Sequence, residues 1–205
     1  MISMRPQNPD ERLIKQVADV LQHGGVAILP TDTIYALVGD IYQGKAIDQI
    51  GRIKGLKLEK SNFSFLCSDL KDISTFTKNI DRSIYRILKR ALPGPYTFIL
   101  EASNEVPSIF RSRKKTIGIR IPDNEIILRV IELIGHPLLA TSLHDDDVIA
   151  EYPTDPNEIN ERYENIVDII VDAGYGNNIP STVIDCTNGE PIVIREGAGS
   201  LEVLV

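Results

Sequence analysis

Apolar side chains recur along the 205-residue chain with two periods, which separate helices from strands. Leu13, Val17 and Leu21 are spaced to line one face of a helix. We expect this helix to begin at an Asn8 cap with Pro9 in its first position, and to end at Gly24. The same pattern predicts further helices over residues 45–53, 81–92, 125–134 and 155–163.

Short continuous apolar runs, bounded by turn-forming residues, are typical of buried strands. Such runs predict strands over residues 26–29, 62–67, 96–100, 116–121, 138–141, 167–171, 182–185 and 192–195. Helices and strands alternate except around residues 96–121 and at the C-terminus, where strands follow one another. The pattern therefore predicts one α/β domain, with a twisted sheet of parallel and antiparallel strands flanked by helices.

Composition is that of an ordinary globular protein, with 42% hydrophobic and 25% charged residues. No apolar run approaches the roughly 20 residues that a membrane helix needs, so we expect no membrane partner. Cys67 and Cys186 each lie in an apolar stretch, which favours two buried free thiols in a reducing cytoplasm. His and Cys residues show no metal-ligand spacing, so we expect no zinc site.

Charge is unevenly distributed, although the net charge is only −7. Residues 1–120 carry 19 Lys and Arg against 12 Asp and Glu, whereas residues 121–205 carry 3 against 17. This split indicates a polarised surface that meets an anion on one side, unless folding interleaves the two halves.

Neither common phosphate-binding loop occurs, so a bound nucleotide would be held by side chains from scattered strand ends. Lys54, Arg120 and Arg195 are the candidate anion contacts; Arg52 is a weaker one. An arginine within an apolar strand needs a partner, which is either a structural carboxylate or an anionic ligand.

Hydroxyl side chains at strand ends form a second group of candidates: Thr33, Ser142 and Ser181. Taken singly, a residue of this kind is more often a turn or cap residue than a ligand contact. Asp32, Thr182 and Asp185 are adjacent, weaker candidates.

Seven blocks occur in an order that resembles the YrdC-like family of threonylcarbamoyl-AMP synthases: PTDTIYAL, RIKG, PGPYTFIL, TIGIRIP, ATS, PSTVID and VIREGAG. The resemblance covers residues 10–199 as one domain, with short tails at 1–9 and 200–205. It implies a YrdC-like fold with an open concave pocket. The implied reaction joins threonine, bicarbonate and ATP, accompanied by Mg²⁺, into threonylcarbamoyl-AMP and pyrophosphate for tRNA modification.

The resemblance also implies roles for the candidate residues. Thr33 and Arg120 would contact threonine, and Lys54 and Arg120 would act in catalysis. The implied nucleotide contacts are Lys54, Ser142, Ser181 and Arg195.

Two signature positions depart from the synthases. Leu56 stands where the synthases carry an arginine, and His144 stands where they carry an asparagine. The changes resemble the YciO-like branch of the family. Losing one charge-assisted phosphate contact costs about 1.5–3 kcal/mol, or roughly ten- to a hundredfold, so we expect weak or altered synthase activity. The acidic run Asp145, Asp146 and Asp147 is either a solvated loop or a metal-recruiting one.

Two alternatives remain open at this point. Family members have been described as binders of double-stranded RNA, and basic side chains could form such a face here; the candidate contacts are Arg111, Arg113, Lys114 and Lys115, with Lys78, Arg82, Arg86, Lys89 and Arg90 on a neighbouring helix. The chain could instead bind threonine or AMP without turnover. The sequence assigns no oligomeric state.

Overall fold

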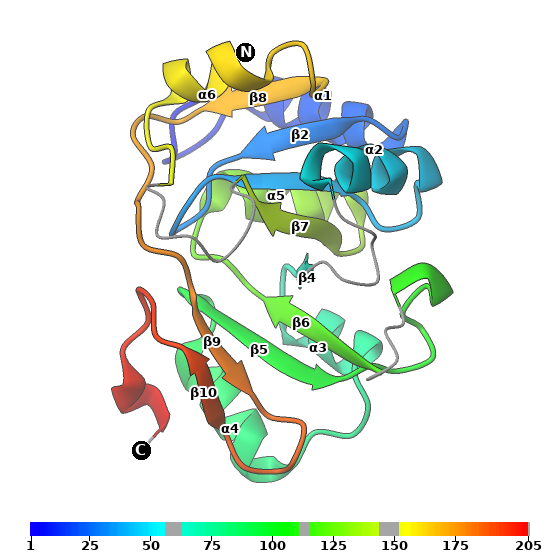
Figure 1. The fold of residues 1–205 in the computed structure, drawn as a ribbon, viewed down its shortest axis with the longest axis vertical. Helices are drawn as coiled ribbons and strands as arrows, with labels where there is room; N and C mark the ends of the chain where they lie inside the picture. Colours follow the sequence, from blue (N-terminus) through cyan, green and yellow to red (C-terminus); the bar gives the residue numbers. More distant parts are fainter. Residues whose placement is uncertain (56–62, 111–114, 144–151, 205) are drawn as a thin grey trace.

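A computed structural model describes residues 1–55, 63–110, 115–143 and 152–204. Its ten strands form one continuous sheet in the order β1-β8-β2-β3-β7-β4-β6-β5-β9-β10 (Figure 1). The strands are β1 (Ile2–Ser3), β2 (Val26–Leu29), β3 (Ala36–Asp40), β4 (Ser64–Leu66), β5 (Tyr96–Glu101), β6 (Thr116–Arg120), β7 (Leu138–Ser142), β8 (Ile169–Asp172), β9 (Thr182–Asp185) and β10 (Ile192–Arg195).

Six α-helices flank the sheet within the described residues. They are α1 (Glu11–Gln22), α2 (Gly44–Lys54), α3 (Leu70–Phe76), α4 (Arg82–Ala91), α5 (Glu125–Ile134) and α6 (Pro156–Tyr163), with short 3-10 turns at Ser108–Phe110 and Leu201–Leu204. The predicted single α/β domain is confirmed.

Pairing within the sheet is mixed, as predicted. β2 and β3 form an antiparallel hairpin, whereas β2 and β8 run parallel. The strand β3 was not predicted, because its apolar residues follow directly on the polar turn at residues 31–33. Two residues of the expected N-terminal tail form β1, which pairs with β8 at the sheet edge.

The predicted start of the first helix is wrong by two residues. Asp10, not Asn8, is the N-cap, and its carboxylate accepts a hydrogen bond of 2.8 Å from the Arg12 backbone N–H. Asn8 has a positive φ of 54°, and its N–H donates to Glu125 Oε2. Asn and Asp both cap helices well. Asp10 is the N-cap here because Asn8 lies in a left-handed turn before the helix, whereas Asp10 has the extended backbone of an N-cap residue.

Two hydrophobic layers enclose the sheet around β2. Val26 and Ile28 point into the layer that contains α2 and α6, whereas Ala27 and Leu29 point into the layer with α1 and α5. This alternation is the period of two that a strand covered on both faces imposes. Figure 1 shows α2 and α6 on one side of this half of the sheet and α5 behind it.

The other half of the sheet is covered less evenly. Along β5, Tyr96, Phe98 and Leu100 are buried in the layer that contains α3 and α4, whereas Thr97 and Ile99 on the opposite face are only partly buried. This face of β5 is therefore the more open one, and one end of it carries the candidate site described below.

Both cysteines are free and buried, as predicted. Burial raises the pKa of the Cys67 thiol well above its usual range and that of Cys186 to about 12. A thiol acts as a nucleophile only as its thiolate, so neither residue suits nucleophilic chemistry at neutral pH. Separately, none of the described helices is long and apolar enough to cross a membrane.

Thiol reactivity tests this account of the core. At pH 8 a thiol with a pKa near 12 carries a thiolate fraction about 10³-fold lower than an unfolded cysteine. We expect both cysteines to resist a colorimetric disulfide reagent over minutes in the native protein, and both to react promptly in denaturant. Prompt reaction of either thiol in the native protein would contradict the burial described here.

Candidate functional site

A buried ion pair stands at the centre of the candidate site. Arg120, the last residue of β6, places Nη2 2.5 Å from Asp32 Oδ1. The same nitrogen lies 2.7 Å from Thr33 Oγ1 and 3.2 Å from Thr31 Oγ1. The Arg120 and Asp32 side chains are 8% and 11% exposed, so the pair is largely removed from water.

The pair joins segments that are distant in the sheet order. β2, which precedes Asp32, and β6 are separated by three strands, which corresponds to about 19 Å between strand axes. An arginine side chain cannot span that distance, so the loop after β2 must fold back toward the end of β6. Thr31 fixes the loop, because its hydroxyl donates to the Ile34 carbonyl and accepts from the Thr33 N–H.

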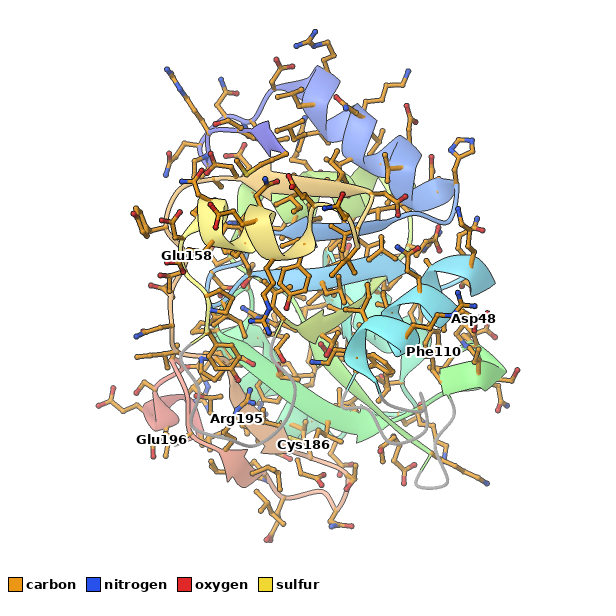
Figure 2. The ribbon with its side chains drawn as sticks, turned by 45° about the horizontal axis from the view of Figure 1, so that its top comes forward. Asp48, Phe110, Glu158, Cys186, Arg195 and Glu196 are labelled. Atoms are coloured by element: carbon orange, nitrogen blue, oxygen red, sulfur yellow. The ribbon has the colours of Figure 1, made fainter. Side chains whose placement is uncertain are left out.

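Arg195 forms a second cationic group with the strand β9. Its Nη2 donates to the Ser181 carbonyl at 2.9 Å, and the Ser181 hydroxyl lies 2.8 Å from Thr97 Oγ1 on the more open face of β5. Figure 2 shows Arg195 near Glu196, below Glu158 of α6 in that view.

The two arginines are close enough to influence each other. Burial lowers the pKa of the Arg120 guanidinium; Asp32 opposes this change, and the positive charge of Arg195 adds to it. Two guanidinium groups that interact with each other, of which Arg120 is paired with the Asp32 carboxylate, leave positive charge at the site. An arrangement of this kind suits an anionic ligand.

Glycines after β10 allow the chain to close against β9. A Cβ atom on Gly197 would lie 2.2 Å from the Pro180 carbonyl oxygen, which no side chain tolerates. The Gly197 N–H donates to the Thr182 hydroxyl, which in turn donates to the Gly199 carbonyl. The glycines of the EGAG block are therefore needed for this close approach, which lies beside Ser181.

Lys54 and Ser142 form a third group. Lys54 ends α2 and is only 7% exposed, and its Nζ donates to the Ser142 carbonyl at 3.1 Å. Ser142 ends β7 and pairs with Ala36, three residues after Thr33. The sheet register therefore brings this group to the strand that leads out of the Thr31–Thr33 loop.

A loop after β8 holds the Thr31–Thr33 segment in place. The Asn177 side chain donates to the Asp32 carbonyl, and the Asn177 N–H donates to the Thr33 carbonyl. The Tyr35 hydroxyl donates to the Gly174 carbonyl at 2.7 Å and accepts from the Ala173 N–H. No pattern in the sequence predicted these contacts of Tyr35 and Asn177.

Several predicted residues lie outside the part of the chain that the structure describes. They are Leu56, Arg111, Arg113, Lys114, His144, Asp145, Asp146 and Asp147. Lys115 is described, and it is exposed with a positive φ of 53°.

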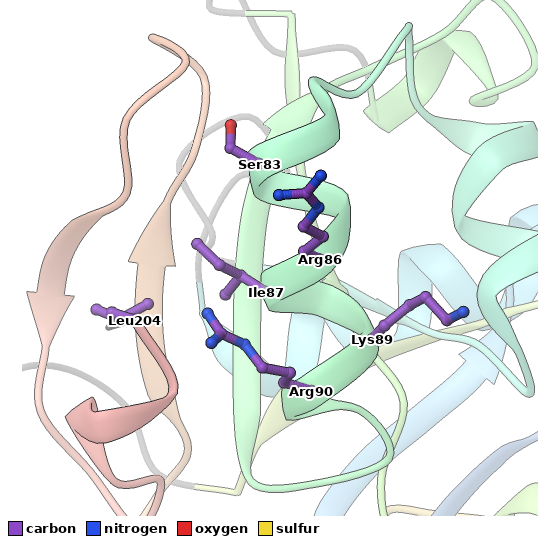
Figure 3. Close-up of a pocket in the computed structure, with 6 residues that line it drawn as sticks. All are labelled: Ser83, Arg86, Ile87, Lys89, Arg90 and Leu204. Atoms are coloured by element: carbon purple, nitrogen blue, oxygen red, sulfur yellow. The ribbon is translucent and has the colours of Figure 1, made fainter.

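A hollow of about 600 Å³ lies on α4; none of the candidate threonine or nucleotide contacts lines it, whereas three of the candidate RNA contacts do. Figure 3 shows its lining, in which Ile87 and Arg90 of α4 lie on the side toward Leu204: Ser83, Arg86, Ile87, Lys89, Arg90 and Leu204.

Residues 19–197 match the model of the Sua5/YciO/YrdC family, which is described as telomere recombination. The chain is 40% identical over 201 residues to YciO of Escherichia coli strain K12, covering 97% of this chain and 96% of that protein. It is 28% identical over 194 residues to the threonylcarbamoyl-AMP synthase of Pyrococcus abyssi, covering 94% of this chain but 56% of the synthase.

Solved structures agree with the sequence comparison. The crystal structure of Escherichia coli YciO matches with a TM-score of 0.92 at 39% identity, over 100% of this chain and 98% of that one. The structure of Pyrococcus abyssi Sua5 complexed with L-threonine matches with a TM-score of 0.88 at 28% identity, over 98% of this chain and 58% of that one.

The fold and the basic, hydroxyl-lined strand ends define an α/β domain of the YrdC-like class. The chain belongs to the Sua5/YciO/YrdC family.

Tyr35 provides a test of how the site loop is held. In Tyr35→Phe, the Ala173 N–H and the Gly174 carbonyl lose their side-chain partner. We therefore expect the free energy of unfolding, measured by urea titration, to fall by about 1–3 kcal/mol. Tyr175→Phe is the matched control, because Tyr175 is 79% exposed and its change should stay within about 0.5 kcal/mol. Equal effects of the two substitutions would show that the Tyr35 hydroxyl does not hold this loop.

Proposed function

We propose that this protein binds ATP and L-threonine and forms threonylcarbamoyl-AMP, the activated intermediate of a tRNA modification, at a rate below that of the synthases. One observation carries the proposal: three cationic side chains, Lys54, Arg120 and Arg195, each contact a strand-end Ser or Thr residue. The similarity to a Sua5 structure that contains L-threonine supports it.

Each group has a role in this reaction. Arg120 and Thr33 hold the threonine carboxylate and hydroxyl, because a guanidinium and a hydroxyl suit these acceptors. The nucleotide is held by Lys54, Ser142, Ser181 and Arg195, and Lys54 and Arg120 also stabilise negative charge during the reaction.

The chemistry requires no protein nucleophile. The threonine amine takes up the carboxyl group of bicarbonate and releases water; an oxygen of the resulting carbamate then attacks the α-phosphate of ATP, and pyrophosphate leaves. Bicarbonate, the threonine carboxylate and the ATP phosphates are all negatively charged groups that repel one another, so the site contributes mainly alignment and positive charge.

Mg²⁺ would enter with ATP, held by the phosphate oxygens. The described residues contain no group of three or more His, Cys, Asp or Glu side chains that could hold a metal. Asp32 is engaged by Arg120. The residues that the structure describes therefore fit a metal carried by the nucleotide rather than one bound by protein ligands alone.

The rate of threonylcarbamoyl-AMP formation is proposed to be low because of the residues at positions 56 and 144. Leu56 offers no charge where the synthases carry an arginine, and His144 cannot reproduce both the donor and the acceptor of an asparagine amide.

Pyrophosphate release in the presence of ATP, Mg²⁺, threonine and bicarbonate tests the proposal. We expect Lys54→Ala to lower the rate by at least about tenfold, because a buried charge-assisted contact to phosphate is lost. Lys45→Ala is the matched control: Lys45 is exposed near the start of the same helix, so the rate should stay within about twofold.

Wild-type release no faster than that of Lys54→Ala would contradict synthase activity. If threonine or AMP still raised the melting temperature, the protein would be a ligand binder without turnover.

A second candidate function, binding of double-stranded RNA, is favoured by the exposed basic residues of α4. Arg86, Lys89 and Arg90 line the hollow of Figure 3, and Arg82 is exposed on the same helix. Regularly spaced cations on one surface suit a phosphate backbone.

Salt dependence tests this second candidate. We expect duplex RNA affinity to fall steeply with salt, and Arg86→Ala with Lys89→Ala to reduce the slope of log affinity against log salt by about 0.7–0.9 per lost contact. Arg162→Ala on α6 serves as the control and should leave the slope unchanged. Affinity that does not vary with salt would rule out this mode of binding.

A further inference from the structure

Two polar atoms of the central ion pair are buried without a partner. Within the described residues, three buried side-chain nitrogen or oxygen atoms lack any hydrogen bond, and two of them are Arg120 Nε and Asp32 Oδ2. The third belongs to Asn160 on α6. An unsatisfied donor and an unsatisfied acceptor therefore occur together on one ion pair.

These atoms lack partners because the hydrogen bonds of the Arg120 guanidinium to this loop all involve one nitrogen, Nη2. Arg120 Nη2 carries two hydrogens but lies within hydrogen-bond distance of three oxygens, on Thr31, Asp32 and Thr33. A two-pronged arginine–carboxylate pair would also use Nε and the second carboxylate oxygen. The single-pronged geometry leaves both of those atoms without a hydrogen-bond partner.

The ligand that fits such a pair offers an acceptor to Arg120 and a donor to Asp32. A free α-amino acid has both: a carboxylate and an ammonium group separated by one carbon atom. An anion without the ammonium group would satisfy the arginine but would meet the negative charge of Asp32.

We propose that Asp32 is a specificity-determining residue of this site, which selects a free α-amino acid over carboxylates that lack an amino group. This inference rests on the proposed function, because it assumes that an amino acid binds beside Arg120. It adds to that function the residue, Asp32, that would bind the amino group of the amino acid.

The geometry permits this contact. The two side chains keep 8% and 11% of their surface exposed, so the pair borders the surface of the site. The terminal torsion of an aspartate is broad and nearly two-fold, so the Asp32 carboxylate can turn to present Oδ2. Asn177 holds the Asp32 backbone through the Asp32 carbonyl, which leaves the carboxylate free of that anchor.

Calorimetric titration with two ligands tests the proposal: L-threonine, and 3-hydroxybutyrate, which is threonine without its amino group. We expect the wild-type protein to bind threonine at least tenfold more tightly than 3-hydroxybutyrate. In Asp32→Asn, which keeps the size and removes the charge, this preference should fall at least tenfold. The loss should come from weaker threonine binding, with 3-hydroxybutyrate bound as tightly as before or more tightly.

An unchanged preference in a folded Asp32→Asn protein would overturn the proposal while leaving the proposed function intact. Absence of threonine binding to the wild type would instead overturn the proposed threonine site, and this inference with it. Asp32→Glu provides a second variant should Asp32→Asn fail to fold. It keeps the charge and should retain the wild-type preference within about threefold, and loss of the preference in a folded Asp32→Glu protein would contradict a role for the charge.

Discussion

The ion pair between Arg120 and Asp32 holds together parts of the site that the sheet order alone keeps apart. It fixes the end of β6 against the loop after β2, and the hydroxyls of Thr31 and Thr33 share the same guanidinium nitrogen. A buried ion pair of this kind is costly to desolvate, and removing one partner leaves a charge without compensation. The position of the Thr31–Thr33 loop, and of any ligand bound there, therefore depends on both partners being present.

Positive charge near this pair comes from different parts of the chain. Arg195 is positioned by Ser181, the residue before β9, and Lys54 by Ser142 on β7. The excess of basic residues in positions 1–120 thus explains only part of the positive charge at the site, because Arg195 lies in the acidic half of the chain. What matters chemically is that the Arg120 and Arg195 guanidinium groups lie close enough to interact, in a place partly removed from solvent, where charge interactions are strong.

Much of the fold could be predicted from local patterns. The helix at residues 125–134 and the strand at 182–185 have their predicted bounds. Apolar spacing and capping residues mark the helix, and turn-forming residues bound the short run of the strand. The helix α3 carried similar signals, since Asp69 caps it and Ile73 and Phe76 form its buried face, but they were too short to stand out. The partner of Arg120 could not be predicted, because Asp32 lies 88 residues away and only the fold of the sheet brings the two together.

A double-mutant cycle on the free energy of unfolding tests the central claim most directly. Arg120→Met and Asp32→Asn would each destabilise the protein, and the double variant should lose less than the sum of the two, with a coupling of about 1–3 kcal/mol. Such a coupling would show that each side chain stabilises the fold through the other. Effects that simply add would contradict the account, because the loop after β2 would then be held in place without the ion pair.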